Sequence, residues 1–286
     1  MQFRFTPEQE SFRKEIRAFL REAGEAASIE AQGGRWERYR AFQKRMAERG
    51  WLTLAWPKEY GGQAADYMTQ LVFNEEMSYH GAPNPGIGVD RVGPTMMIYG
   101  TEEQKAFHLP RIAAGEVIWC QGFTEPQAGS DLASLQTRAV LDGDSFVING
   151  QKMFTSLAHA ADYCALLART DPEAPKHRGI SYFLLDMRTP GITVRPLLDA
   201  MGNHTFNEVF LEDVRVPRSS VLGEVNRGWY LASTTLDFER SGIHRVMGSF
   251  RQFEMLVDFC RAEHGDASAL IQRPSVRHRL ADLKIA

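Results

Sequence analysis

The spacing of apolar residues changes twice along this chain, and these changes restrict its fold more than any other feature of the sequence. Before Ile118 the apolar residues recur every three or four positions, which is typical of amphipathic helices. From there to Gly223 they alternate, and Asp142-Gly143 and Asn149-Gly150 are dipeptides that favour hairpin turns. After Gly223 the helical spacing returns. We therefore expect a helical region, a small β-sandwich or barrel, and a second helical region.

Local patterns divide the chain further. Threonine and glutamine stand three residues apart at 6–9 and 101–104, which predicts capping boxes at two helix starts. The strands expected in the β region are 163–167, 180–185, 192–194 and 208–216. A last amphipathic helix begins within 275–286, and its apolar face is unfinished. The domains expected from these patterns are 1–117, 118–223 and 224–286.

Composition excludes several classes of function. The 33 basic and 36 acidic residues are well mixed, so no nucleic-acid surface is expected. No apolar run is long enough to span a bilayer, and no secretory signal follows Met1. Three widely spaced cysteines suit a reduced compartment, so we expect a cytoplasmic protein. Cys260 and His264 could lie on one helical turn, but two ligands make no structural zinc site, and no metal is predicted.

Residues 122–139, GFTEPQAGSDLASLQTRA, carry the first chemically suggestive pattern. A strand runs into a loop that holds Gly129, Ser130 and Asp131, and the backbone N–H groups and hydroxyl of such a loop suit a polar cofactor. A plain surface loop with a serine turn explains the same residues, and composition alone favours that simpler interpretation.

Residues 150–170, GQKMFTSLAHAADYCALLART, carry the second pattern. Phe154 stands two residues before Ser156, and strand alternation would put both on one face. A ring and a hydroxyl there could bind a flat heterocycle, although a core phenylalanine beside a solvated serine is the simpler alternative. FNEVFLEDVRVP, residues 206–217, is typical of a strand that leaves the β region at a proline.

A carboxylate interrupts the apolar face of the helix predicted after Gly223. That face consists of Leu236, Ile243, Met247, Phe250, Phe253 and Val257. Glu239 lies between the first two of these residues. It could pair with Arg240 or Arg245 at a contact between helices, or it could be a catalytic carboxylate in apolar surroundings.

In this order and spacing, the motifs resemble the acyl-CoA dehydrogenase family. The resemblance is carried by TEPQAGSD, INGQKMFTS and NEVFLEDVRVP, together with WPKEYGG and YGTEEQKAFHLPRIAAGE nearer the N-terminus. It covers essentially the whole chain. It implies an α+β fold with an N-terminal helical domain, a central β-barrel-like domain and a C-terminal helical bundle, which this chain leaves incomplete.

The resemblance also implies FAD, bound between the β domain and the C-terminal helices. The residues that it places at the cofactor are Gln121, Phe123, Thr124, Ser130, Phe154 and Ser156. The first three would lie against the isoalloxazine, and Ser130 would lie near the phosphates or the substrate. The last two would lie beside the flavin, where the family usually has tryptophan at the position of Phe154.

For catalysis, the resemblance assigns Glu239 as the base that removes the α-proton of an acyl-CoA thioester. In a minority of the family the base comes from the first C-terminal helix, in a D-x-E-R context that Asp237 to Arg240 match. Asp237 and Arg240 would line the acyl-CoA site. The stretch CRAEHG departs from the family's R-x-x-F-G pattern because His264 replaces the phenylalanine, so Arg261 is not assigned to the cofactor.

Two hypotheses follow. The first is an FAD-dependent acyl-CoA dehydrogenase that forms trans-2-enoyl-CoA and passes electrons to an electron-transfer flavoprotein, as a homo- or hetero-oligomer. An oxidase or a nitroalkane-oxidising relative would belong to the same class. The second is a non-catalytic or FAD-completing subunit of an unlike-subunit complex. LDFERSG and WPKEYGG look similar to bacterial members of that kind, some of which act on steroid side-chain CoA esters.

Overall fold

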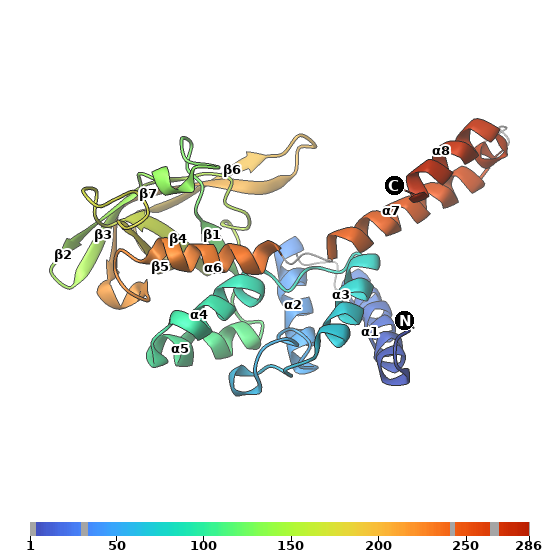
Figure 1. The fold of residues 1–286 in the computed structure, drawn as a ribbon, viewed down its shortest axis with the longest axis horizontal. Coiled ribbons are helices and arrows are strands. Elements are labelled where there is room, and N and C mark those ends of the chain that lie inside the picture. Colours follow the sequence, from blue (N-terminus) through green and yellow to red (C-terminus); the bar gives the residue numbers. More distant parts are fainter. Residues whose placement is uncertain (1–3, 30–33, 241–243, 264–268, 286) are drawn as a thin grey trace. The chain divides into compact units, whose positions relative to one another are not determined.

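The computed structural model describes residues 4–29, 34–240, 244–263 and 269–285, and the chain divides into two compact units (Figure 1). The helices of the first unit are α1 (Pro7–Ile29), α3 (Tyr67–Tyr79), α7 (His244–Arg261) and α8 (Pro274–Ile285). The helices of the second are α2 (Arg35–Glu48), α4 (Gly93–Tyr99), α5 (Glu102–Ala113) and α6 (Gly228–Arg240). None of the described helices combines the length and the apolar character that a membrane span requires.

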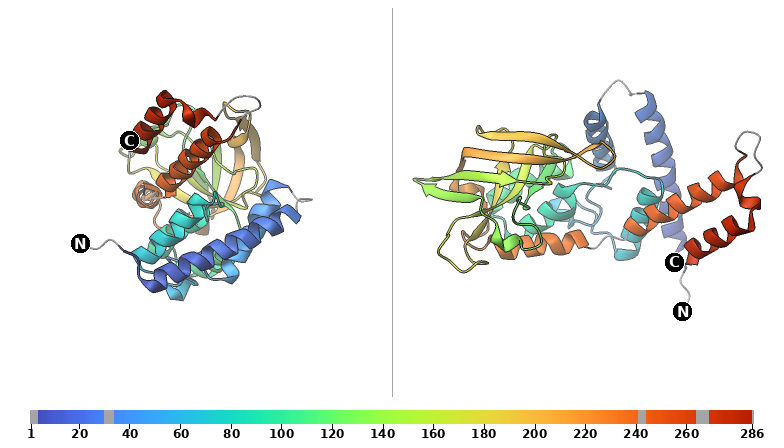
Figure 2. Two further views of the ribbon diagram at one scale, coloured as in Figure 1. Left: turned by 90° about the vertical axis from the view of Figure 1, so that its right-hand side faces the viewer. Right: turned by 90° about the horizontal axis from the view of Figure 1, so that it is seen from above.

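In the first unit, α3 packs against α1 and α7, and α8 lies beside α7 (Figure 2). Ile16 and Phe19 on α1 are fully buried, as the spacing of its apolar face predicts. A buried carboxylate, Glu76 on α3, accepts hydrogen bonds from Arg13 at 2.6 Å and Arg17 at 2.7 Å. Burial disfavours its ionised form, but the two guanidinium groups outweigh burial and hold the pKa of Glu76 below its usual value.

The second unit is built on one eight-stranded sheet (Figure 1). Its strands are β1 (Trp119–Gly122), β2 (Arg138–Asp142), β3 (Ser145–Lys152), β4 (Tyr163–Arg169), β5 (Ile180–Asp186), β6 (Ile192–Leu198), β7 (His204–Pro217) and β8 (Val221–Leu222). The order is β6-β7-β3-β2-β4-β5-β8, and β1 pairs in parallel with β4. Strands β4 and β5 are buried along almost their whole length, and α6 packs against β5.

A π-helix, η2 (Gly88–Val92), leads directly into α4 in the second unit. Helix α6 packs against both η2 and α4. Short 3-10 turns lie at Lys58–Tyr60, Leu132–Ser134 and Arg218–Ser220 in the second unit, and at Leu270–Gln272 in the first. π-Helices are rare in proteins and, where they occur, often lie at functional sites. The contact between η2 and α6 is therefore a candidate part of a functional site.

The predicted order of helical, β and helical segments is confirmed, and so are the four predicted strands. Both capping boxes are present: Gln9 donates from its backbone to Thr6 Oγ1 at 3.3 Å, and Gln104 does the same to Thr101 at 3.2 Å. The turn at Asp142-Gly143 is also confirmed, because Asp142 pairs with Ser145 across the β2–β3 hairpin.

Two predictions about local structure are corrected. Asn149-Gly150 is no hairpin turn; it lies inside β3, where the pairing with β7 shifts in register. Glycine is needed there because a Cβ on Gly150 would lie 2.5 Å from Thr137 Oγ1. The single long helix predicted after Gly223 is described as two elements, α6 and α7, and residues 241–243 between them lie outside the described residues.

Candidate functional site

Two of the sequence motifs meet at one end of β3. The backbone N–H of Met153, just past the strand, donates to the carbonyl of Thr124 at 2.8 Å. This bond joins the loop that follows β1 to the segment that carries Phe154 and Ser156. The structure therefore brings together three of the residues predicted to contact a cofactor.

A buried ion pair between Lys152 and Glu125 stabilises this junction, and the sequence did not predict it. Lys152 is fully buried at the end of β3, and its Nζ lies 2.8 Å from Glu125 Oε1. Glu125 also accepts from the backbone N–H groups of Gln136 at 2.6 Å and Thr137 at 2.9 Å. Burial opposes ionisation, but Lys152 and these donors hold the pKa of Glu125 below its usual value.

The pattern that would have revealed this pair is the alternation along β3. Phe146 and Ile148 are buried, and Lys152 occupies a later position on the same inward face. A lysine at an apolar position requires a buried partner. Lys152 thus shares with Glu239 the pattern of a charged residue in a predicted apolar face.

Phe154 and Ser156 lie beyond the end of β3, so the expectation that strand alternation places them on one face is wrong. Phe154 adopts the left-handed backbone conformation, with φ of 54°, and its side chain is 55% exposed. It contacts Phe206 edge to face, with ring centroids 6.1 Å apart. Ser156 is half-buried in the same turn. The structure thus presents an aromatic ring and a nearby hydroxyl outside the sheet.

The other predicted cofactor residues occupy different environments. Gln121, on β1, has a buried Oε1 without a donor among the described groups. Phe123 is buried against Tyr182, and its backbone carbonyl accepts from Lys152 Nζ at 3.3 Å. Ser130 is exposed beyond the tight turn formed by Glu125 and Ala128, and no contact of the described residues joins it to Phe154.

These groups are a suitable set for a flat heterocycle such as a flavin. An exposed aromatic ring can cover its face, the free amide oxygen of Gln121 can accept from a ring N–H, and the Thr124 and Ser156 hydroxyls can bond its edge. A metal site would need at least three clustered His, Cys, Asp or Glu side chains, and no such cluster occurs among the described residues.

The predicted catalytic residue, Glu239, lies on α6 and faces the π-helix. Its Oε2 is 3.5 Å from an Nη1 nitrogen of Arg91, which belongs to η2. The Glu239 side chain is 31% exposed, so the carboxylate is half-buried rather than enclosed by apolar residues. No ion pair joins Glu239 to Arg240 among the described residues, and the Arg245 side chain, the other predicted partner, lies outside them.

A pair of buried hydroxyls joins α6 to α4 one turn before Glu239. Thr95 Oγ1 lies 2.9 Å from Thr235 Oγ1 and donates to the carbonyl of Arg91 at 2.8 Å. Asp237 and Arg240, the predicted substrate residues, are exposed on α6. Arg91 is a candidate site residue that the sequence interpretation did not find, because helical spacing does not predict a π-helix.

The motif WPKEYGG acquires a structural role here. Trp56 donates from Nε1 to the carbonyl of Val89 in η2 at 3.0 Å, and the bond is buried. A Cβ on Gly93, at the start of α4, would lie 2.2 Å from the Trp56 ring. The indole therefore packs directly on the backbone that carries Arg91.

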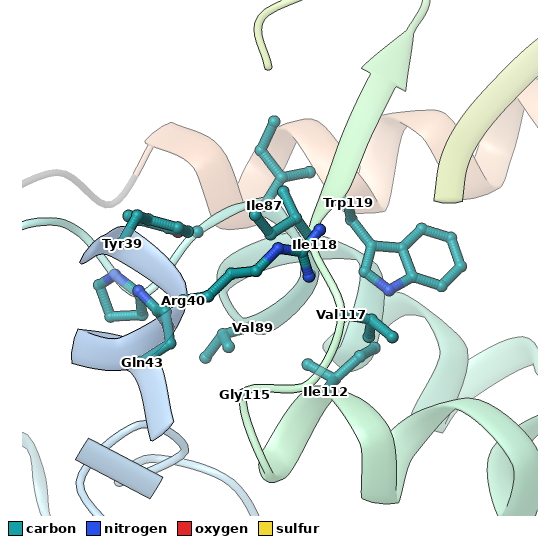
Figure 3. Close-up of a pocket in the computed structure, with 13 residues that line it drawn as sticks. Tyr39, Arg40, Gln43, Ile87, Val89, Ile112, Gly115, Val117, Ile118 and Trp119 are labelled. Atoms are coloured by element: carbon teal, nitrogen blue, oxygen red, sulfur yellow. The ribbon is translucent and has the colours of Figure 1, made fainter. Parts of the chain in front are cut away.

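A small enclosed space lies beside this backbone (Figure 3). It is lined by Tyr39, Arg40 and Gln43 of α2, by Ile87 and Val89, and by the segment that enters β1. Its volume is about 20 Å³, which is room for one water molecule and far too little for a flavin or an acyl chain. It is a packing feature rather than the substrate site.

Comparison with protein-family models assigns consecutive parts of the chain. The models described as acyl-CoA dehydrogenase N-terminal domain, middle domain and C-terminal domain match residues 6–116, 120–214 and 226–286, respectively. The chain is 45% identical to acyl-CoA dehydrogenase FadE26 of Mycobacterium tuberculosis over 84% of its own length. It spans 62% of the length of that relative.

Solved structures agree with this assignment. A structure titled Tcur3481-Tcur3483 steroid ACAD matches with a TM-score of 0.88 and 41% identity, covering 100% of this chain and 75% of that one. The ChsE4-ChsE5 complex from Mycobacterium tuberculosis matches with a TM-score of 0.85 and 38% identity, covering 100% of this chain and 74% of that one.

Proposed function

Because the chain belongs to the acyl-CoA dehydrogenase family, we propose that it carries out FAD-dependent α,β-dehydrogenation of an acyl-CoA thioester. Glu239 takes the α-proton on its carboxylate, and the electrons of that C–H bond form the Cα–Cβ double bond of trans-2-enoyl-CoA. FAD, when bound, would supply the acceptor for the β-hydrogen, which would leave as hydride to N5. The electrons then pass to an electron-transfer flavoprotein.

The observation that carries this proposal is the geometry of Glu239 and Arg91. At 3.5 Å the ion pair is longer than a strong charge-assisted hydrogen bond of about 2.7–2.9 Å. The cation therefore favours a defined position of the carboxylate while leaving its lone pairs available. Oxygen atoms that are oriented but not saturated with donors are what a base requires.

We assign the flavin contacts to the junction beyond β3. Thr124, Phe154 and Ser156 supply hydroxyls and a ring, Gln121 supplies an unpartnered amide oxygen, and the buried Phe123 remains a proposed contact. Ser130 remains a proposed contact to the phosphates or the substrate. Asp237 and Arg240, exposed beside Glu239 on α6, are proposed to bind the acyl-CoA. The domain division at residues 117 and 223 is proposed with them.

A visible spectrum of the purified protein, with and without acyl-CoA esters in the absence of oxygen, tests the proposal. Straight-chain esters and steroid side-chain esters belong in the panel, since a steroid ACAD is among the similar structures. We expect one ester to bleach the flavin band in the natural protein and not in Glu239→Gln. The matched control is Glu224→Gln, which changes an exposed carboxylate just before α6. Equal bleaching in Glu239→Gln and the control would refute the assignment of the base.

The second candidate function is an FAD-completing or non-catalytic subunit of a hetero-oligomer. The similarity to a chain of the ChsE4-ChsE5 complex favours it. Co-purification with a second, unlike acyl-CoA dehydrogenase chain, and flavin binding only in its presence, would support this function. A flavin-loaded chain that bleaches without a partner would exclude it.

A further inference from the structure

The turn that presents Phe154 and Ser156 is conformationally strained. Phe154 and Leu157 both adopt positive φ angles, 54° and 65°, although neither is glycine. The left-handed conformation costs an ordinary side chain roughly 1–2 kcal/mol. Two such residues in four persist only where the surroundings determine the backbone.

Asn207, a fully buried residue of β7, holds the middle of this turn from both sides. Its backbone carbonyl accepts from the N–H of Thr155 at 3.0 Å, and its Nδ2 donates to the carbonyl of the same residue at 2.9 Å. Thr155 is itself buried and lies between the two residues proposed to face the flavin. Both polar groups of its backbone are therefore fixed by one asparagine.

Two histidines fix the amide of that asparagine. Because Nδ2 donates to a carbonyl, Oδ1 must point the other way, and there it lies 2.7 Å from His204 Nε2 and 3.1 Å from His159 Nδ1. Both nitrogens must then carry hydrogen and donate. The two imidazoles are stacked, with centroids 3.9 Å apart and planes 29° apart.

The electrostatic surroundings favour a neutral ring at His159. Burial lowers its pKa, and His204 and Arg35 lower it further, against the opposing effect of the bond to Asn207. Trp36 contacts the same imidazole edge to face, with centroids 5.1 Å apart. The cluster also borders an open cavity of about 380 Å³, which His159, His204 and Asn207 help to line.

We propose that Asn207 is a positioning residue for the flavin contact, and that the stacked pair His159 and His204 holds its amide in the working orientation. This inference rests on the proposed flavin contact of Phe154 and Ser156. Asn207 touches neither cofactor nor substrate; it acts by holding Thr155, which sets the direction of the two neighbouring side chains.

The test uses the full chain and its flavin. Asn207→Asp keeps an acceptor for both histidines but removes the donor to the Thr155 carbonyl. We expect its flavin dissociation constant to rise at least about tenfold, with a changed visible circular dichroism spectrum of the remaining bound flavin. His204→Phe keeps a stacked ring and removes one donor, so a rise of a few-fold is expected. Asn203→Ala, an exposed residue near the start of β7, is the matched control.

A second measurement does not depend on flavin. Amide hydrogen exchange of the peptide 153–158 is compared in the flavin-free natural protein and Asn207→Asp, with thermal unfolding as a check that both are folded. Faster exchange in the variant is expected. Unchanged exchange would show that Asn207 does not hold Thr155, and this result can be read even without flavin. Failure of the natural protein to bind flavin would instead refute the proposed function. Faster exchange with unaltered flavin affinity and spectrum overturns the positioning role.

Discussion

Two carboxylates of the second unit occupy opposite environments. Glu125, in the loop that follows β1, is 3% exposed and is bonded to one ammonium and two backbone N–H groups at 2.6–2.9 Å. Glu239, on α6, has a side chain that is 31% exposed and faces one guanidinium at 3.5 Å. The first is saturated with donors, so it can only hold structure. The second keeps free lone pairs, so it can accept a proton.

The largest expected effect comes from removing the unsaturated carboxylate. Glu239→Gln should lower the turnover number by about 10²–10⁴, the usual contribution of a general base. Because its ion pair is long and partly exposed, the free energy of unfolding should change by less than about 1 kcal/mol. Anaerobic flavin reduction and calorimetry measure the two quantities. A large loss of stability would place Glu239 in the structural class with Glu125.

Glu125→Gln should have the opposite profile. It leaves the ammonium of Lys152 buried without a counter-charge, which costs about 3–5 kcal/mol in comparable buried pairs. Thermal unfolding of the second unit should therefore shift strongly, and flavin binding should be lost along with the fold of the loop. The double variant Glu125→Gln, Lys152→Met should recover part of that stability. Failure of the double variant to recover any would contradict the ion pair as the cause.

A smaller effect is expected when the cation beside Glu239 is removed. Arg91→Met should lower the turnover number by about 10- to 100-fold through a misplaced carboxylate, with little change in KM. Arg91→Lys should recover part of the loss. Thr95→Val, which removes the hydroxyl pair without changing charge, is the control, and steady-state kinetics of all three variants decide the matter. An equal loss in Thr95→Val would mean that packing alone is responsible.

The smallest effect concerns a third carboxylate, Glu76 of the first unit, which is saturated by two arginines. Its folded-state pKa is below its ordinary value, so its contribution is fully present above the unfolded pKa of about 4.3 and is lost as pH falls further. We expect a stability difference on the order of 1 kcal/mol between the natural protein and Glu76→Gln at pH 7. Denaturant unfolding should show the difference shrinking toward pH 3. A difference independent of pH would contradict this assignment.

The fold could be predicted because it depends on periodicity and turn chemistry. The change in apolar spacing and the frequent turn residues located the strands, and the threonine-glutamine spacings located two helix starts. Gly150 was wrongly assigned to a hairpin turn, because glycine is required there by a close approach to Thr137. That contact is tertiary and cannot be read from the neighbouring residues. Phe154 and Ser156 lie in one turn, but the strand that was expected to align them ends at Lys152.

Only part of the candidate site could be predicted from the sequence, for the same reason. Glu239 was proposed because it is a charge in a predicted apolar face, and the same pattern in β3 would have indicated Lys152. Arg91 and Asn207 could not, since a π-helix and an amide clamp are formed by tertiary contacts that no spacing in the chain reveals.

The packing of Trp56 on Gly93 has a consequence for how this sequence can evolve. A methyl group at position 93 would overlap the indole, and a smaller side chain at position 56 would lose the hydrogen bond to the π-helix. The two positions can therefore change together more readily than either can change alone. In an alignment of natural homologues, replacement of Gly93 should accompany replacement of Trp56, and the two sites should co-vary although 36 residues separate them.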